Sequence, residues 1–82
     1  MELTEEQTLD MINSAISWGH EVAEMWTGTQ YEKQIEAEIS RIGIERALGK
    51  IESAKAMAFD LAQFLDQAER EYERADELQK SR

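Results

Sequence analysis

The chain has 82 residues, one histidine, no cysteine and a net charge of -9, from 18 acidic and 9 basic residues. This composition excludes disulfides, thiolate metal sites and a multi-histidine site within one chain. The acidic balance also argues against direct binding to a nucleic-acid duplex or an anionic membrane surface, because both would repel the protein.

The residue types predict an all-α fold in a single domain, residues 1–82. Strong helix formers such as alanine, glutamate and leucine dominate, there is no proline, and glycine occurs four times. No segment approaches the roughly 18 apolar residues that a membrane-spanning helix needs, so we expect no membrane insertion. Scaffolds this small usually depend on a disulfide, a metal or a partner chain. The composition leaves oligomerisation as the expected support.

The first predicted helix covers residues 3–26. Thr4 and Gln7 match a capping box at its start. Its apolar residues form two stripes about 100° apart, which one neighbouring helix cannot cover and two neighbours could. The first stripe is Leu9, Ile12, Ile16, Gly19, Ala23 and Trp26, and the second is Met11, Ala15, Trp18, Val22 and Met25.

A turn is predicted at residues 27–29. Gly28 can adopt the left-handed conformation that ends a helix. Thr29 and Glu32 match a second capping box, so a new helix is expected to begin near Gln30.

The second predicted helix covers residues 30–79 and has two glycines, Gly43 and Gly49, that permit a kink or a break. If it is continuous, the first helix covers it only to about Ser53, and an apolar stripe beyond needs a second chain. If the chain folds back at either glycine, it forms a three-helix bundle. We favour the long helix of a dimerising hairpin, because the apolar seam passes Gly49 in register and no capping residue stands at Lys50. The predicted dimer seam is Ile51, Ala58, Leu61, Leu65 and Ala68.

Two short motifs lie at the turn and near the C-terminal end. Trp26-Thr27-Gly28 is a WxG tripeptide, and Tyr72-Glu73-Arg74-Ala75-Asp76 is a YxxxD pentapeptide. Together with the helix–turn–helix pattern they resemble the WxG family of small helical-hairpin proteins exported by type VII secretion. The segment 65–77 is similar to the end of that family's second helix, and 26–32 to its turn. The first helix is shorter than the resemblance implies.

The resemblance implies a hairpin that dimerises into a four-helix bundle and is secreted in its folded form, without a signal peptide, through a membrane-embedded secretion ATPase. Trp26, Gly28, Tyr72 and Asp76 would then form a composite export signal. In the continuous-helix reading, Tyr72 lies about 65 Å from its own Trp26, at 1.5 Å per residue. The signal would therefore need the turn of one chain and the tail of another.

The sequence predicts no enzyme and no cofactor or metal. His20 and Glu24 lie one helical turn apart, but the residue three before His20 is Ser17 and not a glutamate. No nucleophile–base order or phosphate-binding loop is present. The function expected is protein–protein interaction, with the chain itself or another helical protein as partner. A small acidic inhibitor or adaptor, for instance from a mobile element, that acts in the cytoplasm on a basic groove of a host protein stays as an alternative. So does a plain oligomerisation module.

Overall fold

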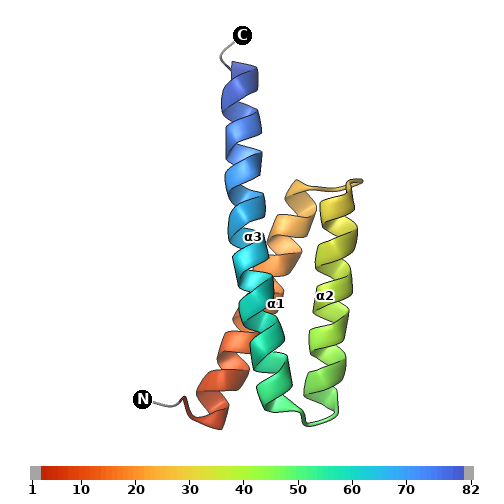
Figure 1. Ribbon diagram of the computed structural model, residues 1–82, viewed down its shortest axis with the longest axis vertical. Coiled ribbons are helices and arrows are strands. Elements are labelled where there is room, and N and C mark those ends of the chain that lie inside the picture. The colour runs from red at the N-terminus through yellow and green to blue at the C-terminus, as the bar shows by residue number, and fades with distance from the viewer. Residues whose placement is uncertain (1–2, 81–82) are drawn as a thin grey trace.

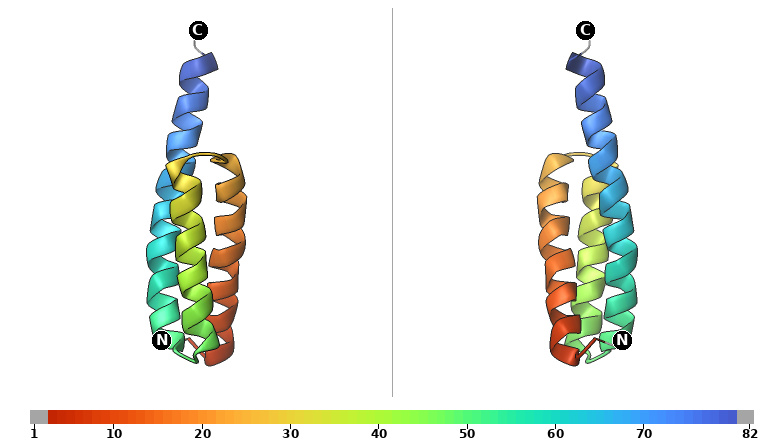
Figure 2. Two further views of the ribbon diagram at one scale, coloured as in Figure 1. Left: turned by 90° about the vertical axis from the view of Figure 1, so that its right-hand side faces the viewer. Right: turned by 90° about the vertical axis from the view of Figure 1, so that its left-hand side faces the viewer.

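A computed structural model of the protein describes residues 3–80, and the side chains of residues 3–75. It consists of three helices, α1 (Glu5–Met25), α2 (Gln30–Ala47) and α3 (Ile51–Lys80). Helices α1 and α3 start at the same end of the bundle, α2 runs in the opposite direction, and α3 extends beyond the α1–α2 turn (Figures 1 and 2). The predicted all-α class is confirmed. No helix in the described range is long and apolar enough to cross a membrane.

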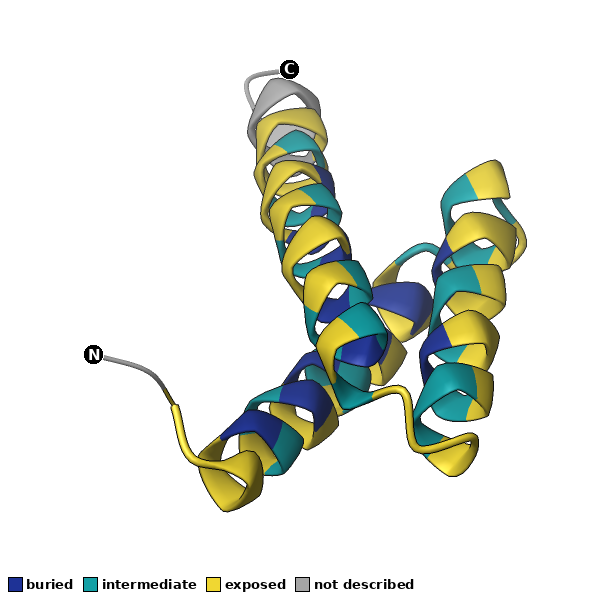
Figure 3. Ribbon diagram, turned by 60° about the horizontal axis from the view of Figure 1, so that its bottom comes forward, coloured by how far each residue is buried: buried dark blue, intermediate teal, exposed yellow. Residues whose placement is uncertain are grey.

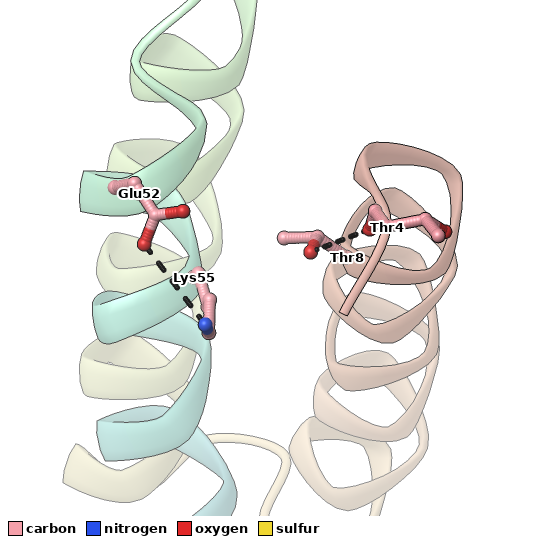
Figure 4. A network of polar contacts seen from close by, with 4 residues as sticks. All are labelled: Thr4, Thr8, Glu52 and Lys55. Carbon is pink, nitrogen blue, oxygen red and sulfur yellow. Dashed lines mark hydrogen bonds and ion pairs between the residues drawn. The ribbon is translucent and has the colours of Figure 1, made fainter. Parts of the chain in front are cut away.

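Helix α1 begins as its sequence predicts. The Thr4 hydroxyl accepts from the Gln7 backbone N–H at 3.1 Å, and the Gln7 side chain accepts from the Thr4 N–H at 3.0 Å. The Thr8 hydroxyl also donates to the Thr4 carbonyl at 2.9 Å (Figure 4). These bonds satisfy backbone groups that the first turn would otherwise leave without partners.

The connection between α1 and α2 is the tight turn expected at Gly28. Gly28 has φ 82°, and the Thr29 N–H donates to the Trp26 carbonyl at 3.1 Å. The predicted Thr29 capping box is wrong, because the Thr29 hydroxyl donates back to the Trp26 carbonyl and makes no cap bond to α2. Glu32 accepts from the Gly28 N–H instead. The Thr29 hydroxyl therefore closes the turn and does not cap α2.

The predicted continuous helix over residues 30–79 is wrong, because the chain reverses at Leu48–Lys50. Gly49 has φ 79°, its N–H donates to the Arg46 carbonyl at 3.0 Å, and the Lys50 N–H donates to the Glu45 carbonyl at 2.9 Å. This pair of bonds is the Schellman ending that a left-handed glycine allows. A strong stop signal at Gly49 thus outweighs the missing start signal at Lys50.

The core is formed by buried residues of all three helices, and the ribbon segments that carry them lie on the inner sides of the helices (Figure 3). The prediction that α1 needs two neighbours is confirmed: Gly19 lies against Ile35 and Ile39 of α2, and the Trp18 indole N–H donates to Glu69 of α3. The buried apolar residues are Ile12, Ala15, Val22, Ala23, Ile35, Ile42, Ala54, Ala58, Leu61, Leu65 and Ala68.

The predicted dimer seam lies inside the single chain. Four of its five residues are at most 2 % exposed, and Ile51 is partly buried against the same core. The fold therefore does not leave this seam for a second copy, because α1 and α2 already cover it. The seam residues are Ile51, Ala58, Leu61, Leu65 and Ala68.

Among the described side chains, no ion pair joins one helix to another. The ion pairs among residues 3–75 join Lys55 to Glu52 at 3.9 Å (Figure 4) and Arg70 to Asp66 at 3.2 Å, both within α3. The acidic helix α1 contacts a basic residue through Asn13, whose side-chain oxygen accepts from Arg46. Exposed ion pairs of this kind contribute little to stability, so apolar packing dominates.

Candidate functional site

Trp26, the first residue of the WxG turn, is fixed against α3. It occupies the C-cap position of α1, and its indole N–H donates to the Ala68 carbonyl at 3.2 Å. The ring is partly buried and packs against the hydrophobic core. Because the acceptor is a main-chain carbonyl, Trp26 ties the α1–α2 turn directly to the backbone of α3.

An aromatic cluster surrounds this tryptophan. Its ring centroid lies 4.7 Å from that of Tyr31 and 5.6 Å from that of Tyr72, the latter in an edge-on arrangement at 83°. Tyr31 in turn lies 5.5 Å from Phe64. These separations fall within the range in which aromatic pairs attract one another. Three helices thus contribute rings to one end of the core.

The contact between Trp26 and Tyr72 overturns the expected separation of about 65 Å. That distance assumed a continuous second helix, whereas the reversal at Gly49 turns α3 back along α1 and brings Tyr72 beside the turn. One chain is therefore sufficient to place the WxG tryptophan next to the YxxxD tyrosine. No second copy is needed for this pairing.

The remaining two residues of the predicted export signal are placed differently. Gly28 is exposed, and a Cβ added to it would meet nothing within 4 Å, so the turn presents open backbone at this point. Asp76 belongs to α3, but its side chain lies outside the described residues.

Tyr31 and Glu71 belong to this site, although the sequence analysis did not select them. The Tyr31 hydroxyl donates to the Glu71 carboxylate, which also accepts from Gln67 at 3.4 Å. The hydrogen bond to Glu71, followed by desolvation and the carboxylate charge, raises the pKa of Tyr31 above its ordinary value of 10.0. The available signal was the position of Tyr31 three residues after Gly28, which places it in the first turn of α2.

This end of the bundle combines aromatic and polar groups. Its groups are aromatic rings, a tyrosine hydroxyl, a carboxylate and an exposed glycine turn. Among the described residues, no group of three or more histidine, aspartate or glutamate side chains is arranged to hold a metal ion. His20, the one histidine, is exposed on α1.

No known protein family, curated protein or solved structure matches this chain.

Proposed function

We propose that the protein is a non-enzymatic protein–protein interaction module, exported in its folded form by a type VII secretion machine. The aromatic end of the bundle would be the surface that the machine binds. The observation that carries the proposal is the edge-on contact of Trp26 and Tyr72 at 5.6 Å, which joins the two resemblance motifs within one chain.

The accessibility of this end supports a recognition role. Tyr72 is 41 % exposed although its ring packs against Trp26, and Gly28, which follows Trp26 in the turn, is also exposed. A partner can therefore contact the outer edge of the tyrosine and the turn backbone together. Aromatic residues with one packed and one exposed side are frequent energetic centres of protein interfaces.

Folding itself would control recognition under this proposal. Trp26 and Tyr72 are 46 positions apart and meet only after α3 has packed on α1. An unfolded chain would present the two motifs separately. The machine would consequently select folded protein, with no need for a linear leader.

Secretion of Tyr72→Ala tests the proposal. In a strain with a working type VII system, the ratio of secreted to cell-associated protein should fall about tenfold or more, as expected when a binding-centre aromatic is removed. Tyr72→Phe keeps the ring packing and should retain most secretion. Phe59→Ala removes a comparably exposed ring, 50 % against 41 %, elsewhere on α3 and should be secreted normally.

Helicity separates the possible explanations of this result. Tyr72→Ala should keep the circular dichroism spectrum of the parent, since the side chain is 41 % exposed and does not belong to the buried core. Normal secretion of Tyr72→Ala would refute the export role of this surface. Loss of helicity in the same variant would assign Tyr72 to the core and would equally remove the proposal.

The second candidate, an acidic adaptor or inhibitor acting on a basic protein surface, is favoured by α1. Residues 1–29 contain no lysine or arginine, and the ion pairs of the described side chains lie within α3. The α1 carboxylates are thus available to an external basic surface. Pull-down with the protein at rising salt would test it, because binding of this kind weakens as charges are screened.

A further inference from the structure

We propose that the groove between α1 and α3 binds a basic amphipathic helix of another protein. This inference rests on the proposed role as an interaction module, but it uses a surface separate from the aromatic end and does not depend on export.

The floor of the groove is apolar. A hollow of about 220 Å³ is lined by Met11, Ala15 and Trp18 of α1 and by Ala58, Phe59 and Ala62 of α3, with Ser14 at its edge. Phe59 is 50 % exposed and lines this hollow together with Trp18, so the apolar surface here is a patch formed by two helices and not a single exposed ring. Small residues alternate with these rings, so side chains of a third helix can enter between them.

The α1 edge of the groove is acidic. A second shallow hollow shares Ser14 and Trp18 with the groove and is bordered by the exposed carboxylates Asp10 and Glu21. The two carboxylates are 11 positions apart, which is three helical turns or roughly 16 Å. They therefore lie along one side of the apolar strip, above and below its centre.

The α3 edge of the groove carries two ion pairs and one further carboxylate, Glu69, which accepts from the Trp18 indole N–H. Lys55, one turn before Phe59, is paired with Glu52, and Asp66, one turn after Ala62, is paired with Arg70. The charges of these two pairs neutralise one another, whereas Glu69 and the acidic residues of α1 give the surface its negative sign. A complementary occupant carries lysine or arginine about three turns apart beside a stripe of leucine-like side chains.

A second copy of the chain is a poorer occupant of this groove. A symmetric dimer would place the same patch on both subunits and would bring the carboxylates of one α1 near those of the other. Each copy also carries a net charge of -9. Like-charge contacts of this kind disfavour association, whereas a basic helix gains from the same field.

The probe for this groove is a labelled synthetic amphipathic peptide of about five turns, with leucines at i, i+3, i+4 and i+7 and lysines on the flanks. A matched peptide carries glutamate in place of every lysine. Fluorescence anisotropy should show binding of the lysine peptide that weakens as salt rises, and no binding of the glutamate peptide. Equal binding of both peptides, or of neither, would overturn the proposal.

Variants of the protein locate the binding. Phe59→Ser should weaken binding of the lysine peptide about tenfold or more, as for the loss of a central apolar contact. Leu48→Ser, which removes a leucine 64 % exposed at the α2–α3 turn, should leave the affinity unchanged. Equal affinity of Phe59→Ser and the parent would place the binding outside the groove.

Charge reversal supplies a test that does not depend on the core. Asp10 and Glu21 are exposed, so replacing both with lysine leaves the packing intact and should weaken the preference for the lysine peptide. Unchanged preference would refute the acidic edge. Sedimentation should show that the parent does not self-associate through the groove. Self-association of the parent that Phe59→Ser abolishes would make a second copy the occupant and would overturn the proposal. Phe59→Ser should also be secreted normally, so failure of the export proposal and failure of this one are separable.

Discussion

Replacing Gly49 with alanine should destabilise the protein, whereas replacing Gly43 with alanine should stabilise it. Gly49 has φ 79° in the α2–α3 turn, and a left-handed conformation costs an L-residue about 1–2 kcal/mol. Gly43 lies inside α2, where an added Cβ would meet nothing within 4 Å, so alanine gains helix propensity of about 1 kcal/mol.

The two substitutions are a matched pair, because both add one methyl group at a site with open space around it. Alanine also restricts the unfolded chain by about 0.4–1 kcal/mol, which reduces the expected loss at Gly49 and is already contained in the helix-propensity gain at Gly43. The net difference between the variants is therefore about 2 kcal/mol. For a domain of this size, about 1 kcal/mol shifts Tm by about 4–8 °C.

Thermal and urea unfolding followed by far-ultraviolet circular dichroism would measure both variants. The expected result is a lower midpoint for Gly49→Ala and a higher midpoint for Gly43→Ala. A continuous helix through residue 49 predicts a different outcome, since both glycines would then be interior and both alanines would stabilise. A rise in stability for Gly49→Ala would refute the turn assigned here.

Three further perturbations test the packing and the aromatic end. Leu61→Asp and Leu65→Asp should each abolish folding, because burial of a lone carboxylate costs several kcal/mol. Leu48→Asp, at a 64 % exposed site that caps the C-terminus of α2, should cost no more than about 1 kcal/mol. Equal helicity of all three variants would show that the core is misassigned. Gly19→Leu should lower the free energy of unfolding in urea by about 1–3 kcal/mol, because even a Cβ at this position would lie 2.8 Å from Ile39 Cδ1. Gly43→Leu is the control, and it should not lower this free energy, because a Cβ there meets nothing within 4 Å. Tyr31 has a raised pKa in the folded state, so the stability it contributes is present below its ordinary pKa of 10.0 and is lost as pH rises through the folded-state pKa. Tyr31→Phe should remove this alkaline loss of stability. An identical dependence of stability on alkaline pH in both proteins would exclude the Glu71 contact as its cause.

Local sequence signals predicted the helices well but not their connection. The Thr4 capping box, the turn at Gly28 and the two apolar stripes of α1 are all present in the structure. Each depends on residues close together in the chain or on a simple helical period. The two stripes required two neighbouring helices, which α2 and α3 supply here, but the stripes alone did not exclude a neighbour from a second chain.

The break at Gly49, which gives the three-helix alternative, was not favoured because its local evidence conflicts. A glycine is tolerated inside a helix at about 1 kcal/mol, and the apolar seam continues in phase on both sides of it. The decisive term is tertiary: folding α3 back buries Leu61 and Leu65 against α1 and α2. The energy of that burial does not depend on the sequence around Gly49, so a local pattern cannot show it.

The same error concealed the candidate site. Trp26 and Tyr72 were each selected from their motifs, but their contact follows from the reversal at Gly49. Tyr31 and Glu71 were missed for a related reason, since 40 positions separate them and their hydrogen bond exists only once α2 and α3 are adjacent. The sequence motifs therefore identified Trp26 and Tyr72 as individual residues, but the order and direction of the three helices determined which residues are in contact.

The two proposed surfaces are connected through one turn of α3, yet they can be tested separately. Trp18, which lines the groove, donates to Glu69, and Trp26, at the aromatic end, donates to the carbonyl of the preceding residue, Ala68. A substitution at either tryptophan would therefore disturb both surfaces. Phe59 and Tyr72 are 13 positions apart, roughly 20 Å along the helix, and mutational effects at that distance are usually additive. These two exposed rings, rather than the tryptophans, are consequently the residues whose substitution can assign peptide binding to the groove and secretion to the aromatic end.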